Sequence, residues 1–123
     1  MSPDADRLSQ ALRHHRQLAR LVQRLDEDLG LHHGLSWSDL LLLDALHEAG
    51  GRLSPRQAAA ATGRSPAGLL RQVLPMEKIG LVQRERGGSE QPQLLLALGG
   101  ARRLREARET VRTLLAENAA QAA

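Results

Sequence analysis

The sequence predicts a mainly α-helical chain that carries one small β-hairpin. Apolar residues recur at steps of three and four near both ends of the chain, which is typical of amphipathic helices. Two helix-start signals, Ser54-Pro55 and Ser65-Pro66, stand on either side of Gly63 and indicate two short helices joined by a tight turn. Residues 81–86 and 93–98 are predicted to pair as strands across a loop that contains Gly and Pro.

The composition limits both the core and the chemistry of this chain. Its 123 residues include a single aromatic residue, Trp37, and no cysteine, whereas leucine and alanine number 25 and 18. The core is therefore expected to be aliphatic, and surfaces that stack bases on several aromatic rings are excluded. The absence of cysteine excludes disulfides, thiolate nucleophiles and cysteine-based zinc sites.

Both ends of the chain predict long amphipathic helices. The first covers residues 4–30 and should end at Gly30; it would be about 39 Å long, more than a compact chain of this size can cover. The second follows a break at Gly99-Gly100. We expect segments 1–35 and 99–123 to pack together and across a homodimer interface. The first apolar seam consists of Leu8, Ala11, His15, Leu18, Val22, Leu25 and Leu29, and the second of Leu104, Ala107, Val111, Leu114 and Asn118.

Residues 36–98 are predicted to form a winged helix-turn-helix between these terminal helices. Ser36 caps a helix that is apolar nearly all round and stops at Gly50-Gly51, which is typical of a buried central helix. Segment 54–80 contains the helix-turn-helix, and the hairpin at 81–98 follows directly as the wing. Together with the terminal helices, these elements predict that residues 1–123 form one winged-helix domain.

Positive charge is concentrated in one part of the chain. The formal net charge is +3, but residues 52–86 contain seven basic and two acidic residues and therefore carry +5. A segment of this kind suits a polyanion such as nucleic acid. The alternative is a solvated arginine-rich surface, since the chain contains 16 arginines and one lysine.

These elements resemble the MarR (multiple-antibiotic-resistance regulator) family of bacterial winged-helix repressors. Gly34-Leu35-Ser36 is similar to the family's entry to its second helix, and segments 52–63 and 65–71 resemble its helix-turn-helix. The stretch Glu77-Lys78-Ile79-Gly80-Leu81-Val82-Gln83-Arg84 is similar to the family's most specific signature. The resemblance implies a cytoplasmic homodimer that binds double-stranded DNA as a transcriptional regulator, acts as a repressor, and often releases its operator when a small-molecule effector binds.

The candidate DNA contacts lie in segment 52–86. They are Ser65, Ala67, Gly68 and Arg71 at the start of the recognition helix, Arg52, Arg56 and Arg64 as phosphate contacts, and Arg84 and Arg86 on the wing. Arg71 is the recognition-helix side chain able to form a bidentate contact with guanine. The alternative for Arg71 is a phosphate or an acid such as Glu77, and for Arg84 it is an intramolecular salt bridge.

Departures from the family pattern support a second hypothesis. Glu90-Gln91-Pro92 stands where the family usually has a minor-groove arginine, and Leu70 stands where threonine or serine is usual. Pro75 lies inside the predicted recognition helix, where loss of a backbone hydrogen bond costs about 3 kcal/mol and should kink the helix. The alternative is therefore a protein-interaction or scaffold module that keeps the fold and the dimer but has lost specific DNA contact.

The remaining candidates concern a ligand pocket and the histidines. From the resemblance we expect an effector pocket between the first two helices, near His14, His33, Trp37 and Leu41. Five histidines raise a metal-sensor hypothesis, but four of them form adjacent pairs that cannot easily face one site, so neither a metal nor a cofactor is expected. With no phosphate-binding Gly-rich loop, no nucleophile elbow and no apolar run near 18 residues, neither an enzyme nor a membrane protein is expected.

Overall fold

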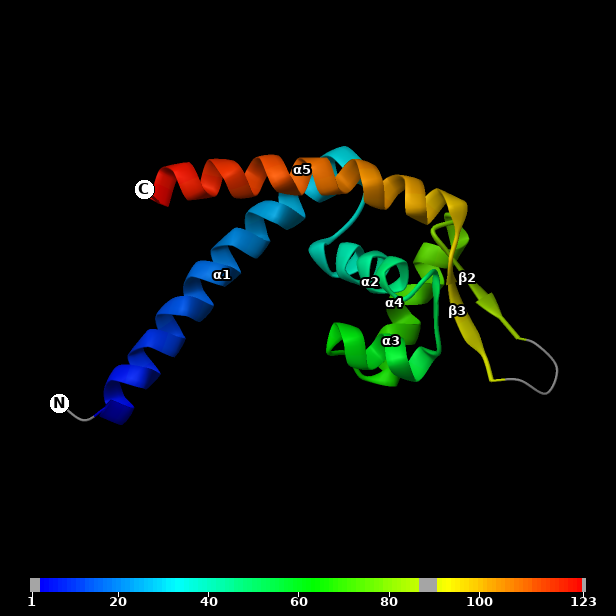
Figure 1. Ribbon diagram of the computed structural model, residues 1–123, viewed down its shortest axis with the longest axis horizontal. Helices are drawn as coiled ribbons and strands as arrows, with labels where there is room; N and C mark the ends of the chain where they lie inside the picture. Colours follow the sequence, from blue (N-terminus) through cyan, green and yellow to red (C-terminus); the bar gives the residue numbers. More distant parts are fainter. Residues whose placement is uncertain (1–2, 87–90, 123) are drawn as a thin grey trace.

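The computed structural model describes residues 3–86 and 91–122, which contain five helices and three short strands (Figure 1). In chain order they are α1 (Pro3–His33), α2 (Trp37–Glu48), β1 (Arg52–Leu53), α3 (Pro55–Thr62), α4 (Pro66–Lys78), β2 (Val82–Glu85), β3 (Gln93–Leu96) and α5 (Leu98–Ala122). The prediction of a mainly helical chain with a small β-hairpin is confirmed. None of the described helices is long and apolar enough to cross a membrane.

Helix α2 lies at the centre of the fold, as predicted. The Asp39 amide donates a hydrogen bond to the Ser36 hydroxyl at 2.9 Å, and the Ser36 amide donates one to the Asp39 carboxylate at 3.0 Å, so these residues form a capping box. The helix contacts α1, α3, α5 and the sheet. Adjacent Leu42 and Leu43 are both buried because different elements cover different faces of α2.

Helices α3 and α4 form the predicted helix-turn-helix. Each begins with a serine N-cap and a proline: Ser54 forms a capping box, and the Ser65 hydroxyl accepts a hydrogen bond from the Gly68 amide at 3.1 Å. Gly63 ends α3 with a φ of 69°, a left-handed conformation that favours glycine. Helix α4 continues through Pro75 to its end without interruption.

The wing belongs to a three-stranded antiparallel sheet. The strand order is β1-β3-β2, and the register places Leu94 of β3 opposite Leu53 on one side and Arg84 on the other. The hairpin is confirmed, although its strands are each two residues shorter than the predicted segments 81–86 and 93–98. Of the predicted loop at 87–92, residues 87–90 lie outside the described residues, and these include Glu90 of the predicted wing tip.

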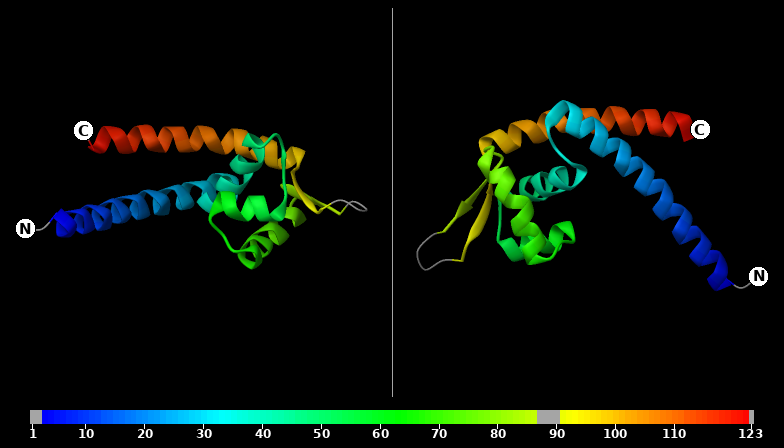
Figure 2. Two further views of the ribbon diagram at one scale, coloured as in Figure 1. Left: turned by 60° about the horizontal axis from the view of Figure 1, so that its bottom comes forward. Right: turned by 180° about the vertical axis from the view of Figure 1, so that it is seen from behind.

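Helix α1 is longer than predicted, and its N-terminal part is uncovered. The helix passes Gly30 and ends at His33, because Gly34 rather than Gly30 adopts the positive φ, 65°, at the end of the helix. The predicted end at Gly30 is therefore wrong. Residues 3–20 are all exposed, and the predicted seam is fully buried only at Leu25 and Leu29. Figure 2 shows the N-terminal part of α1 extending away from the helix-turn-helix and the wing.

Helix α5 begins at Leu98, so the predicted break at Gly99-Gly100 is wrong. Both glycines lie in the first turn of α5, against the backbone that precedes β2. A Cβ on Gly100 would lie 2.0 Å from the Leu81 carbonyl oxygen, and one on Gly99 would lie 2.8 Å from the Gly80 carbonyl oxygen. These positions need glycine for close approach of two backbones and not for a turn.

The buried side chains are aliphatic, as predicted, apart from one methionine. The core cluster joins Leu25 and Leu29 of α1 and Leu104 of α5 to the leucines of α2, and Trp37 packs against it while partly exposed. No polar or charged side chain is buried in the part of the chain that the structure describes. The core therefore holds α4 and the wing in fixed positions relative to the terminal helices.

Candidate nucleic-acid interface

Helix α4 is held by neighbours on three sides and is open on the fourth. Three of its side chains are buried in the core, Gln72 is hydrogen-bonded to α2, and Glu77 is hydrogen-bonded to β2. The open face of α4, as we name it, consists of the exposed residues Ala67, Leu70, Arg71, Leu74 and Lys78. Their spacing of three and four residues places them along one side of the helix.

A polar junction fixes α4 against the start of α2. The Gln72 amide nitrogen Nε2 donates to Asp39 Oδ1 at 3.1 Å and lies 3.4 Å from Ser38 Oγ. The Arg64 guanidinium, in the turn between α3 and α4, also donates to Ser38 Oγ, with its Nε at 3.2 Å. Asp39 thus caps α2 and positions α4 at the same time.

An ion pair joins α4 to the first wing strand. Arg84 Nε lies 3.1 and 3.0 Å from the two carboxylate oxygens of Glu77, and Arg84 Nη2 lies 2.9 Å from Oε1. The hydrogen bonds from Arg84 lower the pKa of Glu77, and those to Glu77 raise the pKa of Arg84. The intramolecular salt bridge that the sequence left open for Arg84 is present, and Glu77 pairs with Arg84 and not with Arg71.

The candidate cations differ in how far they are engaged within the chain. Arg52 lies 3.7 Å from Glu85, so both acidic residues of segment 52–86 have an arginine partner. Within residues 3–86 and 91–122, Arg56, Arg71 and Arg86 form no hydrogen bond or ion pair, and all three are exposed. The segment therefore presents unpaired positive charge and no unpaired acid.

The first turn of α4 contains the other candidate contacts. The Ser65 hydroxyl is engaged as the N-cap of α4, and Ala67 is exposed. Gly68 is half-buried, and a Cβ there would lie 3.2 Å from Ser65 Oγ. Because residues 67 and 68 are small, a large ligand can approach the N-terminal end of the open face of α4.

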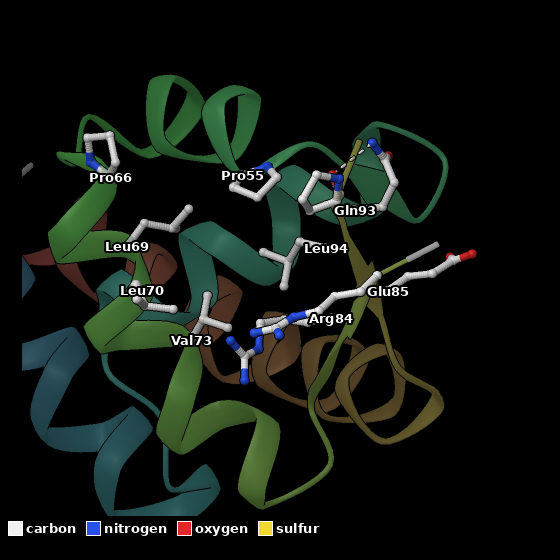
Figure 3. Close-up of a pocket in the computed structure, with 11 residues that line it drawn as sticks. Pro55, Pro66, Leu69, Leu70, Val73, Arg84, Glu85, Gln93 and Leu94 are labelled. Carbon is white, nitrogen blue, oxygen red and sulfur yellow. Dashed lines mark hydrogen bonds between the residues drawn. The ribbon is translucent and has the colours of Figure 1, made fainter. Parts of the chain in front are cut away.

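A cleft of about 370 Å³ lies between α4 and the wing (Figure 3). In Figure 3, Leu69, Leu70 and Val73 project from α4 toward β3, where Leu94 faces them, and the Arg84 side chain crosses the opening. The lining is mostly apolar and is completed by Pro55, Pro66, Glu85, Arg86, Pro92 and Gln93. The helix-turn-helix and the wing together thus form one hollowed surface with arginines at its border.

The four residues expected to form one effector pocket are separated in the protomer. Trp37 and Leu41 line a cavity of about 260 Å³ between α2 and α5. His33 lines a different cavity of about 460 Å³, where its Nε2 lies 2.6 Å from the Thr110 hydroxyl. His14 lies on the exposed part of α1. In the described ranges, no group of three His, Asp or Glu side chains is placed to hold a metal ion.

Sequence reasoning missed the polar junction between α2 and α4. Gln72 lies between Leu69 and Val73 in the helical pattern, which indicates an edge of the buried face but no partner. Its partner Asp39 is 33 residues earlier in the chain. No local pattern connects residues on two helices at that separation, so the signal is present only in the folded chain.

A helix-turn-helix followed directly by an antiparallel hairpin defines the winged-helix class of proteins. The basic surface around α4 is typical of winged-helix proteins that bind nucleic acid.

Comparison with known proteins places the chain within this class. No family model and no curated protein sequence matches it. AbsC, a MarR family transcriptional regulator from Streptomyces coelicolor, has 29% sequence identity over 87% of this chain and 74% of its own, with a TM-score of 0.76. The transcriptional regulator BldR from Sulfolobus solfataricus has 23% identity over 95% and 84% of the two chains, with a TM-score of 0.85.

A third solved structure contains a bound ligand. CouR from Rhodococcus jostii RHA1, bound to p-coumaroyl-CoA, has 22% identity over 81% of this chain and 71% of its own, with a TM-score of 0.73. On the fold and on these matches, the chain has the winged-helix fold of MarR family transcriptional regulators and is similar to them in structure.

Proposed function

We propose that the chain is a homodimeric transcriptional regulator that binds double-stranded DNA and acts as a repressor. Each protomer presents segment 52–86 to one half-site, with the open face of α4 in the major groove and the wing on the backbone or minor groove. The observation that carries this proposal is the charge pairing. Both acids of the segment are paired, whereas Arg56, Arg71 and Arg86 are exposed without a partner among the described residues.

The arginines divide between base and phosphate contacts. Arg71 lies within the open face of α4, where a guanidinium can donate two hydrogen bonds to guanine. Arg56 in the first turn of α3 and Arg86 after β2 flank this helix and would contact phosphates. The arginines already bonded within the chain contribute mainly their charge; these are Arg52, Arg64 and Arg84.

The homodimer would form through the terminal helices. Leu8 and Leu18 of the predicted seam are 62% and 59% exposed, and Leu115 near the end of α5 is 43% exposed. A second copy that covers these leucines would gain about 25 cal/mol for each Å² of apolar surface removed from water. Segments 1–35 and 99–123 would then be the dimerisation part of one domain, and segment 36–98 its DNA-binding part.

A small-molecule effector would bind in the cavity that Trp37 lines. The cavity is lined by one aromatic ring and two leucines, by the ion-paired Arg108 and Asp44, and by Arg112. It therefore suits an amphipathic ligand whose anionic group reaches one of the two arginines. It lies between α2, which is bonded to α4, and the terminal helix α5. The bound p-coumaroyl-CoA of CouR supports a ligand with an aromatic and an anionic part.

The proposal is tested by the salt dependence of binding to duplex DNA, measured by fluorescence anisotropy. If about six phosphates are neutralised per dimer, the logarithm of the binding constant falls with the logarithm of salt concentration at a slope of about −5. A binding constant that does not change with salt concentration, or absence of binding at low salt, would contradict the proposal and favour the scaffold alternative.

Two arginine variants separate base from phosphate contact. Arg71→Ala should weaken binding to a selected site by about 1–3 kcal/mol while binding to random DNA changes little. Arg56→Ala is the matched control, and it should weaken binding to both DNAs alike and make the salt slope less steep by about one per phosphate lost. An equal loss on both DNAs for Arg71→Ala would assign Arg71 to a phosphate.

A further inference from the structure

The open face of α4 is unusually apolar for a surface next to so many cations. Leu70 and Leu74 are 47% and 38% exposed, and Ala67 precedes them on the same side. Arg71 lies next to Leu70 and is the arginine of this face. A ligand that covers these two leucines would remove apolar surface from water, and this would favour binding.

The two leucines are held outward by the neighbours of α4. Val73 and Met76 are buried on the opposite side of the helix, and the bonds of Gln72 to α2 and of Glu77 to Arg84 prevent rotation about its axis. Leu70 also borders the cleft between α4 and the wing (Figure 3). The leucines are thus a fixed part of the surface that faces a ligand.

The charges around the two leucines indicate the occupant. Arg56, Arg71 and Arg86 are unpaired among the described residues, and both acids of segment 52–86 are already engaged by arginines. A polyanion is therefore favoured over a protein partner with mixed charges. In the major groove of DNA, the apolar group at the base edges is the C5-methyl group of a pyrimidine, which is normally that of thymine.

We propose that Leu70 and Leu74 contact pyrimidine C5-methyl groups in the major groove while Arg71 contacts a neighbouring guanine. This inference rests on the proposed function, since it specifies the half-site of the same regulator. The two leucines are four residues apart, which is about 6 Å along the helix. Because base pairs are stacked at about 3.4 Å, the two methyl groups lie about two steps apart, in a half-site that combines thymines with guanine.

The experiment begins with selection of a preferred site from random duplexes by the full chain. Each thymine of that site is then replaced by deoxyuridine, which removes the methyl group and leaves every hydrogen-bonding atom in place. The dissociation constant is measured by fluorescence anisotropy at one fixed salt concentration. We expect a loss of about fourfold for each contacted methyl group, the effect of burying one group of that size.

Variants assign the effect to the two leucines. Leu70→Ser and Leu74→Ser should each abolish the difference between thymine and deoxyuridine at one position and leave it at the other. The matched control is Leu98→Ser, which changes a leucine that is 80% exposed at the start of α5 and should leave both differences intact. Circular dichroism melting curves confirm that each variant is folded, because all three side chains lie at the surface.

The outcomes distinguish this inference from the proposed function. Salt-dependent binding to a preferred site in which every thymine tolerates deoxyuridine would overturn the methyl contact and leave the regulator in place. A deoxyuridine effect that survives in both serine variants would also overturn it. Absence of any DNA binding would contradict the proposed function itself. If the selected site has cytosine at these positions and 5-methylcytosine tightens binding, the methyl contact stands with that base as its source.

Discussion

Glu77 of α4 and Arg84 of β2 form a bidentate ion pair, with Arg84 Nε within 3.1 Å of both carboxylate oxygens. The pair fixes the wing at a set position beside α4. It also neutralises an acidic residue that would otherwise repel a DNA backbone. The two side chains are about one third exposed, so water reaches them and screening weakens the interaction.

Glu77→Gln is expected to change the pH dependence of stability. The pKa of Glu77 is lowered from 4.5 in the folded chain, so the ion pair stabilises the fold above the ordinary carboxyl pKa. That contribution disappears as the pH falls through the lowered value. Melting temperatures between about pH 7 and pH 3 should therefore fall more for the wild type than for Glu77→Gln. Parallel curves for the two proteins would show that the pair does not stabilise the fold.

The same substitution should strengthen non-specific DNA binding. Removal of the Glu77 charge frees Arg84 for a phosphate, so the salt slope should become steeper by about one unit for each protomer. Arg84→Lys is a second variant for this measurement, because lysine keeps the charge but cannot form the bidentate contact with Glu77. If Glu77→Gln leaves both affinity and slope unchanged, the Arg84 side chain lies outside the reach of DNA.

Gly100→Ala and Gly30→Ala are expected to change stability in opposite directions. A Cβ on Gly100 would lie 2.0 Å from the Leu81 carbonyl oxygen, and relief of this clash should cost about 1–3 kcal/mol. Gly30 lies inside α1 with its nearest neighbour atom at 3.9 Å, so alanine there should stabilise the helix by about 0.5–1 kcal/mol. Chemical denaturation measures both. Stabilisation by Gly100→Ala would mean that α5 starts further from β2.

Asp39→Ala tests the junction between α2 and α4. The Asp39 carboxylate accepts hydrogen bonds from the Ser36 amide at 3.0 Å and from Gln72 Nε2 at 3.1 Å. Loss of both should destabilise the protein by about 1–2 kcal/mol, and because α4 is then less well positioned, affinity for a selected site should fall more than affinity for random DNA. Asp28→Ala, on α1, is the control for loss of one acid and should leave that ratio unchanged.

Leu18→Arg tests the homodimer. Leu18 is 59% exposed in the seam of α1, so an arginine there would place two like charges in the interface of a symmetric dimer. Sedimentation velocity at a series of concentrations should show dissociation to the monomer. Gln10→Arg adds the same charge to an exposed position outside the predicted seam and should leave the dimer intact. A wild-type chain that sediments as a monomer at all concentrations would contradict the proposal.

Trp37 provides a direct measurement for the effector cavity, since the chain contains no other tryptophan and no tyrosine. Titration with benzoate, a small aromatic anion, should change its fluorescence in a saturable way. Leu41→Ala, which alters the lining of the same cavity, should weaken that saturation. His14→Ala should not, because His14 lies on the exposed part of α1. The reverse result would place the ligand near α1.

The starts of α2, α3 and α4 and their caps were predictable because their signals are local. The hydroxyls of Ser36, Ser54 and Ser65 each accept a hydrogen bond from an amide three residues later, and Gly63 has the positive φ that its place after α3 suggested. The spacing of apolar residues likewise indicated the buried side of α5, whereas the predicted seam of α1 is buried only at Leu25 and Leu29. Gly30 was misplaced because a glycine inside a helix and one at its end look alike when the neighbouring residues are helix formers.

The features that depend on tertiary packing could not be predicted, because each joins residues that only the fold brings together. Gly99 and Gly100 resemble a turn in the sequence, but they lie in the first turn of α5, where the carbonyl groups of Gly80 and Leu81 leave no room for a Cβ. Helical periodicity defines the direction in which a side chain leaves its own helix, but it does not define which other element lies in that direction. The sequence therefore showed a basic helix-turn-helix with a wing, and the packing of α4 against α2 and β2 decided that Arg84 is paired while Leu70 and Arg71 stay open to a ligand.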